Sequence, residues 1–110
     1  MIVSYKSKKL ERLCTRAAAM QKQRPDIADN LKRRINALET ADDIGELCEN
    51  DRLGKWHRLT ENRNGQWAGK VSKNERLIFQ PMQNGLEVIE FALETQASEV
   101  LVVEIVDYHD

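Results

Sequence analysis

Two histidines and a short C-terminal cluster are the residues of this chain best suited to acid–base chemistry. His57 stands alone, whereas His109 directly follows Asp107 and Tyr108. Histidine exchanges protons near neutral pH, and an adjacent carboxylate can orient its ring or favour its cationic form. We therefore assign His109 as one proton-transfer group, Tyr108 as the other or as a base-stacking platform, and His57 as an auxiliary group. Which group is the acid and which the base stays open at this point.

Arg76 is the cation that best fits a phosphate site. It alternates with the apolar residues Leu77 and Phe79 in a segment that predicts a β-strand, so its side chain should project away from theirs. A guanidinium presents a fixed fork to phosphate oxygens. RNA can be cleaved without a metal if two groups transfer protons and cations hold the phosphate, so we expect neither metal nor cofactor. The alternative is a solvated arginine paired with Glu75 or Glu104.

Four further cations and one aromatic residue are predicted to bind RNA. They are Arg58, Arg63, Trp67, Lys70 and Lys73. The formal net charge is only −1, but residues 52–76 hold seven bases and two acids, while residues 77–110 hold seven acids and no base. A polyanion responds to the local field, so this near-neutrality does not exclude a nucleic-acid partner. The alternatives are that the opposite charge blocks pair across the fold and that Trp67 packs in the core.

Composition indicates a single domain covering residues 1–110. The chain has 41% hydrophobic and 32% charged residues, the balance of a globular protein. It lacks an apolar run near the roughly 20 residues needed to span a bilayer, and its N-terminal segment lacks the apolar block of a signal peptide. We therefore expect a cytoplasmic protein with no membrane partner. Cys14 and Cys48 are far apart and indicate neither a zinc cluster nor a redox pair.

Helical spacing dominates the first half of the chain, and strand spacing the second. Apolar residues predict one helix from about Ser7 to Ala17 and another from Pro25 to Leu38, while residues 40–43 have capping-box form and could begin a short third helical turn. The predicted strands are Ile2–Tyr5, Trp56–Leu59, 66–70 or 66–72, 76–81 and 100–106. The middle three should form an antiparallel meander, and 100–106 a central strand covered on both faces. Residues 83–99 allow either a strand or a loop. This is an α+β domain with helices on one face of the sheet.

Three segments together resemble the HigB-type toxins of the RelE/ParE superfamily. They are Trp56–Trp67, Glu75–Phe79 and Val103–His109. In order and spacing they match the His-x-Leu motif, the Gly-aromatic strand start, the Arg-(Ile/Leu)-x-Phe strand and the terminal Asp-Tyr-His of that family. The resemblance covers nearly the whole chain, because the N-terminal strand and helical hairpin also fit.

This resemblance implies a RelE-like fold, in which an N-terminal helical hairpin packs on a curved antiparallel sheet. It implies a type II toxin that cuts mRNA in the ribosomal decoding site by attack of the 2′-hydroxyl, without a metal. It also implies an antitoxin partner, which we expect to be a helix-turn-helix protein similar to HigA. By position, the active-site residues of the family correspond to His57, Arg76, Asp107, Tyr108 and His109.

The chain departs from the family at Thr60, where a lysine is often found. Loss of that cation would weaken phosphate stabilisation, and Arg58, Arg63 or Lys70 are the candidates to replace it. A function of another class is a ParE-like protein that poisons a target such as DNA gyrase by binding alone. The C-terminal tyrosine and histidine beside a basic sheet favour the nuclease, because a pure binder does not need them. A third hypothesis is a degenerate or antitoxin-sequestered homologue that the loss of the lysine at position 60 has left weakly active.

Overall fold

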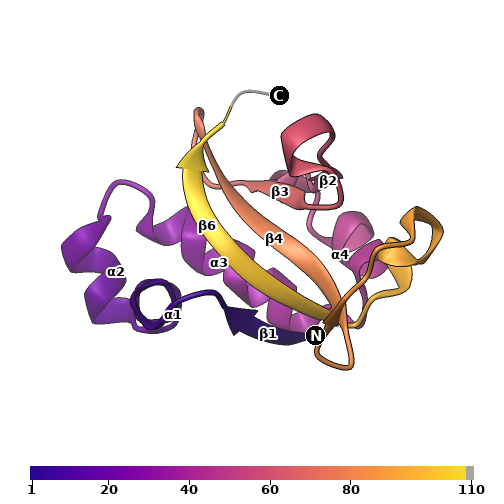
Figure 1. The fold of residues 1–110 in the computed structure, drawn as a ribbon. Coiled ribbons are helices and arrows are strands. Elements are labelled where there is room, and N and C mark those ends of the chain that lie inside the picture. Colours follow the sequence, from indigo (N-terminus) through magenta and orange to yellow (C-terminus); the bar gives the residue numbers. More distant parts are fainter. Residues whose placement is uncertain (109–110) are drawn as a thin grey trace.

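The chain forms one layer of helices packed on one face of a curved, mostly antiparallel sheet (Figure 1). The computed structural model describes residues 1–108. The helices are α1 (Lys8–Thr15), α2 (Ala17–Gln23), α3 (Ala28–Thr40) and α4 (Ile44–Asn50), with 3-10 turns η1 (Arg52–Gly54), η2 (Glu61–Arg63) and η3 (Phe91–Gln96). The strands are β1 (Ile2–Tyr5), β2 (His57–Arg58), β3 (Trp67–Lys70), β4 (Glu75–Gln83), β5 (Leu86–Glu87) and β6 (Glu99–Asp107). In this part of the chain, no helix has the length and apolar character needed to cross a bilayer.

The first predicted helix is in fact two. Ser7 caps α1, its hydroxyl accepting a hydrogen bond from the backbone N–H of Leu10, and the helix ends at Arg16, whose backbone is extended. Cys14 and Met20 are both buried, although in one continuous helix residues six apart would point in directions about 120° apart. The break at Arg16 lets both side chains reach the core.

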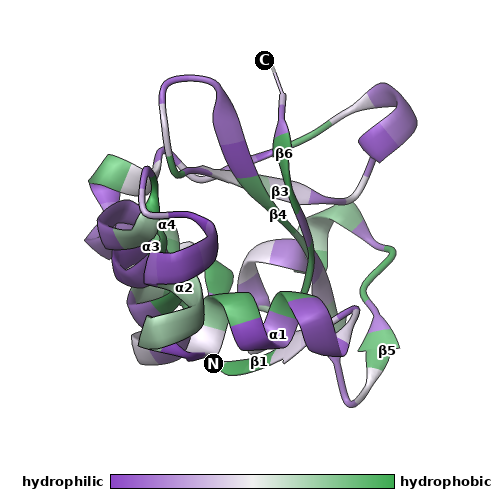
Figure 2. Ribbon diagram, turned by 90° about the vertical axis from the view of Figure 1, so that its left-hand side faces the viewer, coloured by the Kyte–Doolittle hydropathy of each residue, from purple (hydrophilic) through white to green (hydrophobic). Residues whose placement is uncertain are grey.

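The predicted capping box is displaced along the chain. Thr40 is the last residue of α3, and Asp43 is the N-cap of α4, its carboxylate accepting from the backbone N–H of Glu46 at 2.8 Å. The third helix is therefore confirmed, but with another cap. In Figure 2, α1 and α3 each carry both hydrophilic and hydrophobic residues, as expected of helices with one buried side.

The strand order is β1-β6-β4-β3-β2, with β5 attached to β4. The antiparallel meander β2-β3-β4 is confirmed, and β6 takes the predicted central place between β1 and β4. The pair β1 and β6 is parallel, a departure from the expected all-antiparallel sheet. A bulge lies between Ile78 and Phe79, which face Glu104 and Val102 respectively. Residues 83–99, left open by the sequence, supply β5 and η3.

The main core lies between the helices and the sheet. Leu31 and Leu38 of α3 pack there with Leu77 and Phe79 of β4 and Val102 of β6, and all five are fully buried. Trp56 enters the same core so tightly that a Cβ atom on Gly69 would lie 2.3 Å from its ring. The opposite face of β6 is only half covered, because Val103 and Val106 are partly exposed there, which corrects the expectation of a strand covered on both faces.

Candidate functional site

The sheet face opposite the helices, here called the open face, carries a small apolar floor. Directly opposed residues on neighbouring strands point to the same face, so the register places His57, Ala68 and Ile78 together on this side. Ala68 and Ile78 are fully buried, and Leu59 joins them in a cluster separate from the main core. Arg76 lies two residues before Ile78 on β4, so its side chain projects to the open face, as the strand alternation predicted. This face is not wholly exposed to solvent, because the apolar floor is buried.

Two cations stand side by side above this floor. Arg76, two residues before Ile78 on β4, lies directly opposite Lys70 of β3 and Val106 of β6. The guanidinium donates through Nη1 to the carbonyl of Ser72 at 2.9 Å and to that of Glu75 at 3.0 Å, which fixes it over the turn between β3 and β4. Because Lys70 and Arg76 are directly opposed on neighbouring strands, they bring two positive charges to one place on the open face. Both side chains are half-buried.

Tyr108 lies on the same face as these cations. Its side chain packs against the apolar floor, and its backbone N–H donates to the carbonyl of Asn74 at 3.1 Å. The guanidinium carbon of Arg63 lies 5.8 Å from the centroid of the tyrosine ring, while Nη2 of Arg63 contacts Oε2 of Glu104 at 2.8 Å. The ring is thus held between the floor and a cation, which fixes its position on the open face.

His57 approaches this face from the edge strand β2. Its Nδ1 lies 2.8 Å from the carbonyl oxygen of Lys55. A carbonyl oxygen only accepts, so Nδ1 carries the proton in this arrangement, and in the neutral ring the lone pair is on Nε2. Nε2 is buried in this structure, so the ring lies against the sheet and does not present this atom to solvent.

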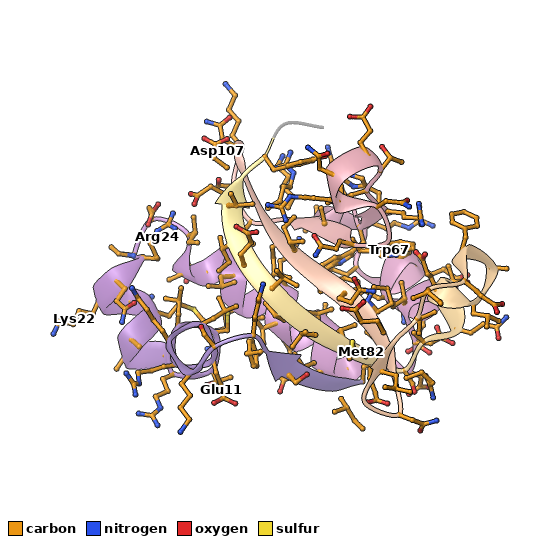
Figure 3. All side chains as sticks on the ribbon, viewed as in Figure 1. Glu11, Lys22, Arg24, Trp67, Met82 and Asp107 are labelled. Carbon is orange, nitrogen blue, oxygen red and sulfur yellow. The ribbon has the colours of Figure 1, made fainter. Side chains whose placement is uncertain are left out.

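Asp107 does not share the open face with Tyr108. It is directly opposite Glu75, and two residues earlier Ile105 packs against the main core, so strand alternation directs Asp107 to the helical side. Figure 3 labels it at the upper end of β6, where it is exposed. Tyr108 therefore lies on the same face as Arg76, whereas Asp107 does not. His109 lies outside the described residues.

The residues predicted to bind RNA divide between the two faces. Trp67, labelled in Figure 3, is only 7% exposed. Its ring stacks on that of Phe79 within the main core, with a centroid separation of 6.4 Å. Trp67 is therefore a core residue and not a platform for bases, because the face of its ring is covered. Arg58, its cross-strand neighbour, also belongs to the helical side. Lys73 is exposed in the turn beside Arg76.

Of the three cations considered as replacements for the lysine at position 60, Lys70 and Arg63 lie at the open face, although Arg63 is paired with Glu104. Thr60 itself is exposed in the loop after β2. Arg58 is engaged elsewhere, with its Nε 2.9 Å from a carboxylate oxygen of Glu94. The open face thus keeps cationic side chains without a lysine at position 60.

Glu94 is the residue that sequence reasoning missed. It lies in η3 with 1% exposure and accepts from Nε1 of Trp67 at 2.8 Å as well as from Nε of Arg58. The sequence gives little signal for it, because a single glutamate in residues 83–99 usually lies in solvent. Among residues 1–108, histidine, cysteine and acidic side chains form no group of three that could hold a metal ion.

Comparison with known proteins gives three similarities. Residues 3–95 match the family described as RelE-like toxin of type II toxin-antitoxin system HigB. A protein named Endoribonuclease HigB, from Proteus vulgaris, is 36% identical over 80 residues, which are 73% of this chain and 84% of that protein. The solved structure of a YoeB/ParE toxin from Agrobacterium tumefaciens has a TM-score of 0.58 at 14% identity, covering 99% of this chain and 100% of its own. The structural similarity confirms the predicted α+β fold.

Proposed function

The chain belongs to the HigB-like family of RelE-like toxins from type II toxin-antitoxin systems, and we propose that it is an endoribonuclease that cuts mRNA at its open face. The observation that carries this proposal is the group formed by Lys70, Arg76 and Tyr108 over one apolar floor, with His57 on the same side. A relative with 36% identity bears the name Endoribonuclease HigB, which supports the same activity.

The proposed reaction is a transesterification within the RNA. The 2′-oxygen forms a bond to the adjacent phosphorus while its proton passes to a general base, the bond from phosphorus to the 5′-oxygen breaks, and a general acid protonates that oxygen. The products are a 2′,3′-cyclic phosphate and a 5′-hydroxyl. No step in this sequence requires a metal.

The side chains divide these tasks as follows in the proposal. Tyr108 and His109 transfer the protons, and His57 is an auxiliary group on the same face of the sheet. Arg76 and Lys70 stabilise the negative charge that develops on the phosphorane, and Arg76 is fixed for this by its bonds to the turn carbonyls. Asp107 has no direct part, since it belongs to the helical side of β6.

Partners follow from the family and from the charge. Membership in a type II toxin-antitoxin family implies an antitoxin partner, and we propose that it is a helix-turn-helix protein. The described residues place three cations on the open face, Lys70, Arg76 and Arg63, and each phosphate contact requires a nearby Lys or Arg, so we expect weak affinity for free RNA. We therefore propose that the ribosome presents the mRNA and that the toxin acts in the cytoplasm.

The test is cleavage of a defined mRNA with and without programmed ribosomes. Cut sites are mapped by primer extension, and the 3′ ends are examined for the cyclic phosphate. The wild-type protein should cut only the ribosome-bound message. Arg76→Ala should lower the rate by about 100- to 1,000-fold, as expected for loss of a transition-state cation. Lys22→Ala, in α2 far from the sheet (Figure 3), should leave it unchanged.

A further variant separates the two roles considered for Tyr108. Tyr108→Phe should lower the rate by about 100-fold or more if the hydroxyl transfers a proton, and should leave it nearly unchanged if only the ring is needed. An intact message in the presence of wild-type protein and ribosomes would refute the nuclease. Inhibition of DNA gyrase in the same preparation would then favour a toxin that acts by binding alone.

A further inference from the structure

Glu94 is a carboxylate in the interior, and two side-chain N–H groups donate to it. It is the only carboxylate of residues 1–108 that is buried, with 1% exposure. Its Oε1 accepts from Nε1 of Trp67 at 2.8 Å, and its two oxygens accept from Nε of Arg58 at 2.9 and 3.1 Å. Phe91 covers the guanidinium from outside, with 4.7 Å between the Arg58 Cζ and the ring centroid. A buried ion pair of this kind fixes geometry more reliably than it adds stability, because desolvation offsets much of its attraction.

The element that this carboxylate holds is a short strand at the edge of the sheet. β2 consists of His57 and Arg58 alone, lies at the end of the strand order, and has β3 as its single neighbour. A ladder of two residue pairs fixes a strand poorly. Glu94 joins β2 to β3 a second time, from the helical side, through Arg58 and Trp67. Because side chains alternate along a strand, the residue before Arg58 then projects to the open face.

The same ion pair also reaches the turn after β2. Nη1 of Arg58 donates to Oδ1 of Asn64 at 2.9 Å and to the carbonyl of Leu59 at 3.4 Å. Arg63, beside Asn64 at the end of η2, extends to the open face and lies over the ring of Tyr108. One carboxylate therefore supports, from behind, both the histidine and the arginine that approach the site from this edge.

We propose that Glu94 is a positioning residue for the active site, which holds β2 and the η2 turn in register through Arg58 so that His57 and Arg63 face the RNA. This assignment rests on the proposed nuclease function. It also gives Arg58 a role different from RNA binding. If Arg58 bound RNA, release from Glu94 would strengthen binding and lower KM, whereas loss of positioning lowers kcat and leaves KM unchanged.

The experiment measures kcat and KM for cleavage of ribosome-bound mRNA by wild-type protein, Glu94→Gln, Arg58→Met and the double variant. Glutamine keeps the length of the side chain but turns an N–H₂ group toward one of the two donors. Glu90→Gln, an exposed glutamate of the same segment, is the matched control. Thermal melting of every variant shows the temperature range in which all are folded, and the rates are compared within that range.

We expect Glu94→Gln to lower kcat by about 10- to 100-fold, the cost of a displacement on the scale of 1 Å, with KM within about twofold of wild type. The double variant should be no slower than Arg58→Met, because both changes act through one contact. Glu90→Gln should behave as wild type. These results together would support the assignment.

Three other results would overturn it. An unchanged kcat with a lower melting temperature would make Glu94 a residue of the fold alone. A lower KM with kcat retained would return Arg58 to RNA binding. Wild-type protein that fails to cut ribosome-bound mRNA would refute the nuclease itself, and the positioning role with it, before any variant is compared.

Discussion

The cationic pair on the open face should reduce the stability of the fold while it serves the reaction. Lys70 and Arg76 are directly opposed across β3 and β4, and like charges in that arrangement are destabilising. Two unit charges about 6 Å apart repel by about 0.7 kcal/mol at the dielectric constant of bulk water, about 80, and by more where the protein excludes water. We therefore expect Lys70→Met to raise the free energy of unfolding by about 0.2–1 kcal/mol.

The same substitution should weaken cleavage. Removal of one phosphate contact should lower kcat/KM by about tenfold, equivalent to about 1.4 kcal/mol. It should also make the dependence of log KM on log salt shallower by nearly one unit, because one fewer counterion is released. Lys70→Met is thus expected to be a more stable and less active protein.

The assay is urea unfolding at about 0.05 M and about 1 M salt, followed by cleavage kinetics on the same samples. At about 1 M salt the screening length falls to about 3 Å, so the gain in stability should disappear. Lys73→Met, in the adjacent turn, is the control and should show no comparable gain, since it has no cross-strand cation. A gain that persists at high salt, or no gain at low salt, would refute the electrostatic reasoning.

Three further predictions concern the fold. Gly69→Ala should lower the free energy of unfolding by about 1–3 kcal/mol because the new Cβ meets the Trp56 ring, and Trp56→Leu should suppress most of this loss in urea unfolding; strict additivity would contradict the contact. The hydrogen bond from Arg24 holds the pKa of Asp26 below its ordinary 3.8, so Asp26 stabilises the fold above about that pH and loses this effect as the pH falls further. Asp26→Asn should accordingly be slightly less stable than wild type at pH 6 and equal to it near pH 2. Urea midpoints of the two proteins measured across this range would contradict this if their difference stayed the same. Burial raises the pKa of the Cys14 thiol to about 12, so Cys14→Ala should not change the rate at which the native protein reacts with a thiol reagent at pH 8, and a slower reaction in the variant would contradict the burial.

Local patterns in the sequence were sufficient for the elements and for the direction of Arg76. Successive side chains of a strand point to opposite faces, so Arg76 could be placed on the face away from Leu77 without knowledge of the rest of the fold. Apolar residues at three- and four-residue spacing likewise predicted α3, and strand spacing predicted the meander. The helical spacing also suggested one continuous helix through Arg16. The break there depends on the packing of both Cys14 and Met20 in one core, and local helix propensity carries no information about that packing.

Features set by distant contacts were beyond the sequence. The parallel pairing of β1 with β6 joins residues nearly a hundred positions apart, and no local signal specifies it. Glu94 is polar, and only its meeting with Arg58 and Trp67 makes its burial favourable. Asp107 was grouped with its neighbours in the chain, although strand alternation directs it away from Tyr108.

The central place of β6 has a consequence for the biosynthesis of this toxin. β6 is the last of the described strands to be synthesised, yet it separates β1 from β4 and supplies Val106 beneath Tyr108. A nascent chain whose final strand is still inside the ribosomal tunnel therefore has an unpaired N-terminal strand and an incomplete cleavage surface. The sheet can therefore close, and the cleavage surface can form, only once β6 has left the ribosomal tunnel.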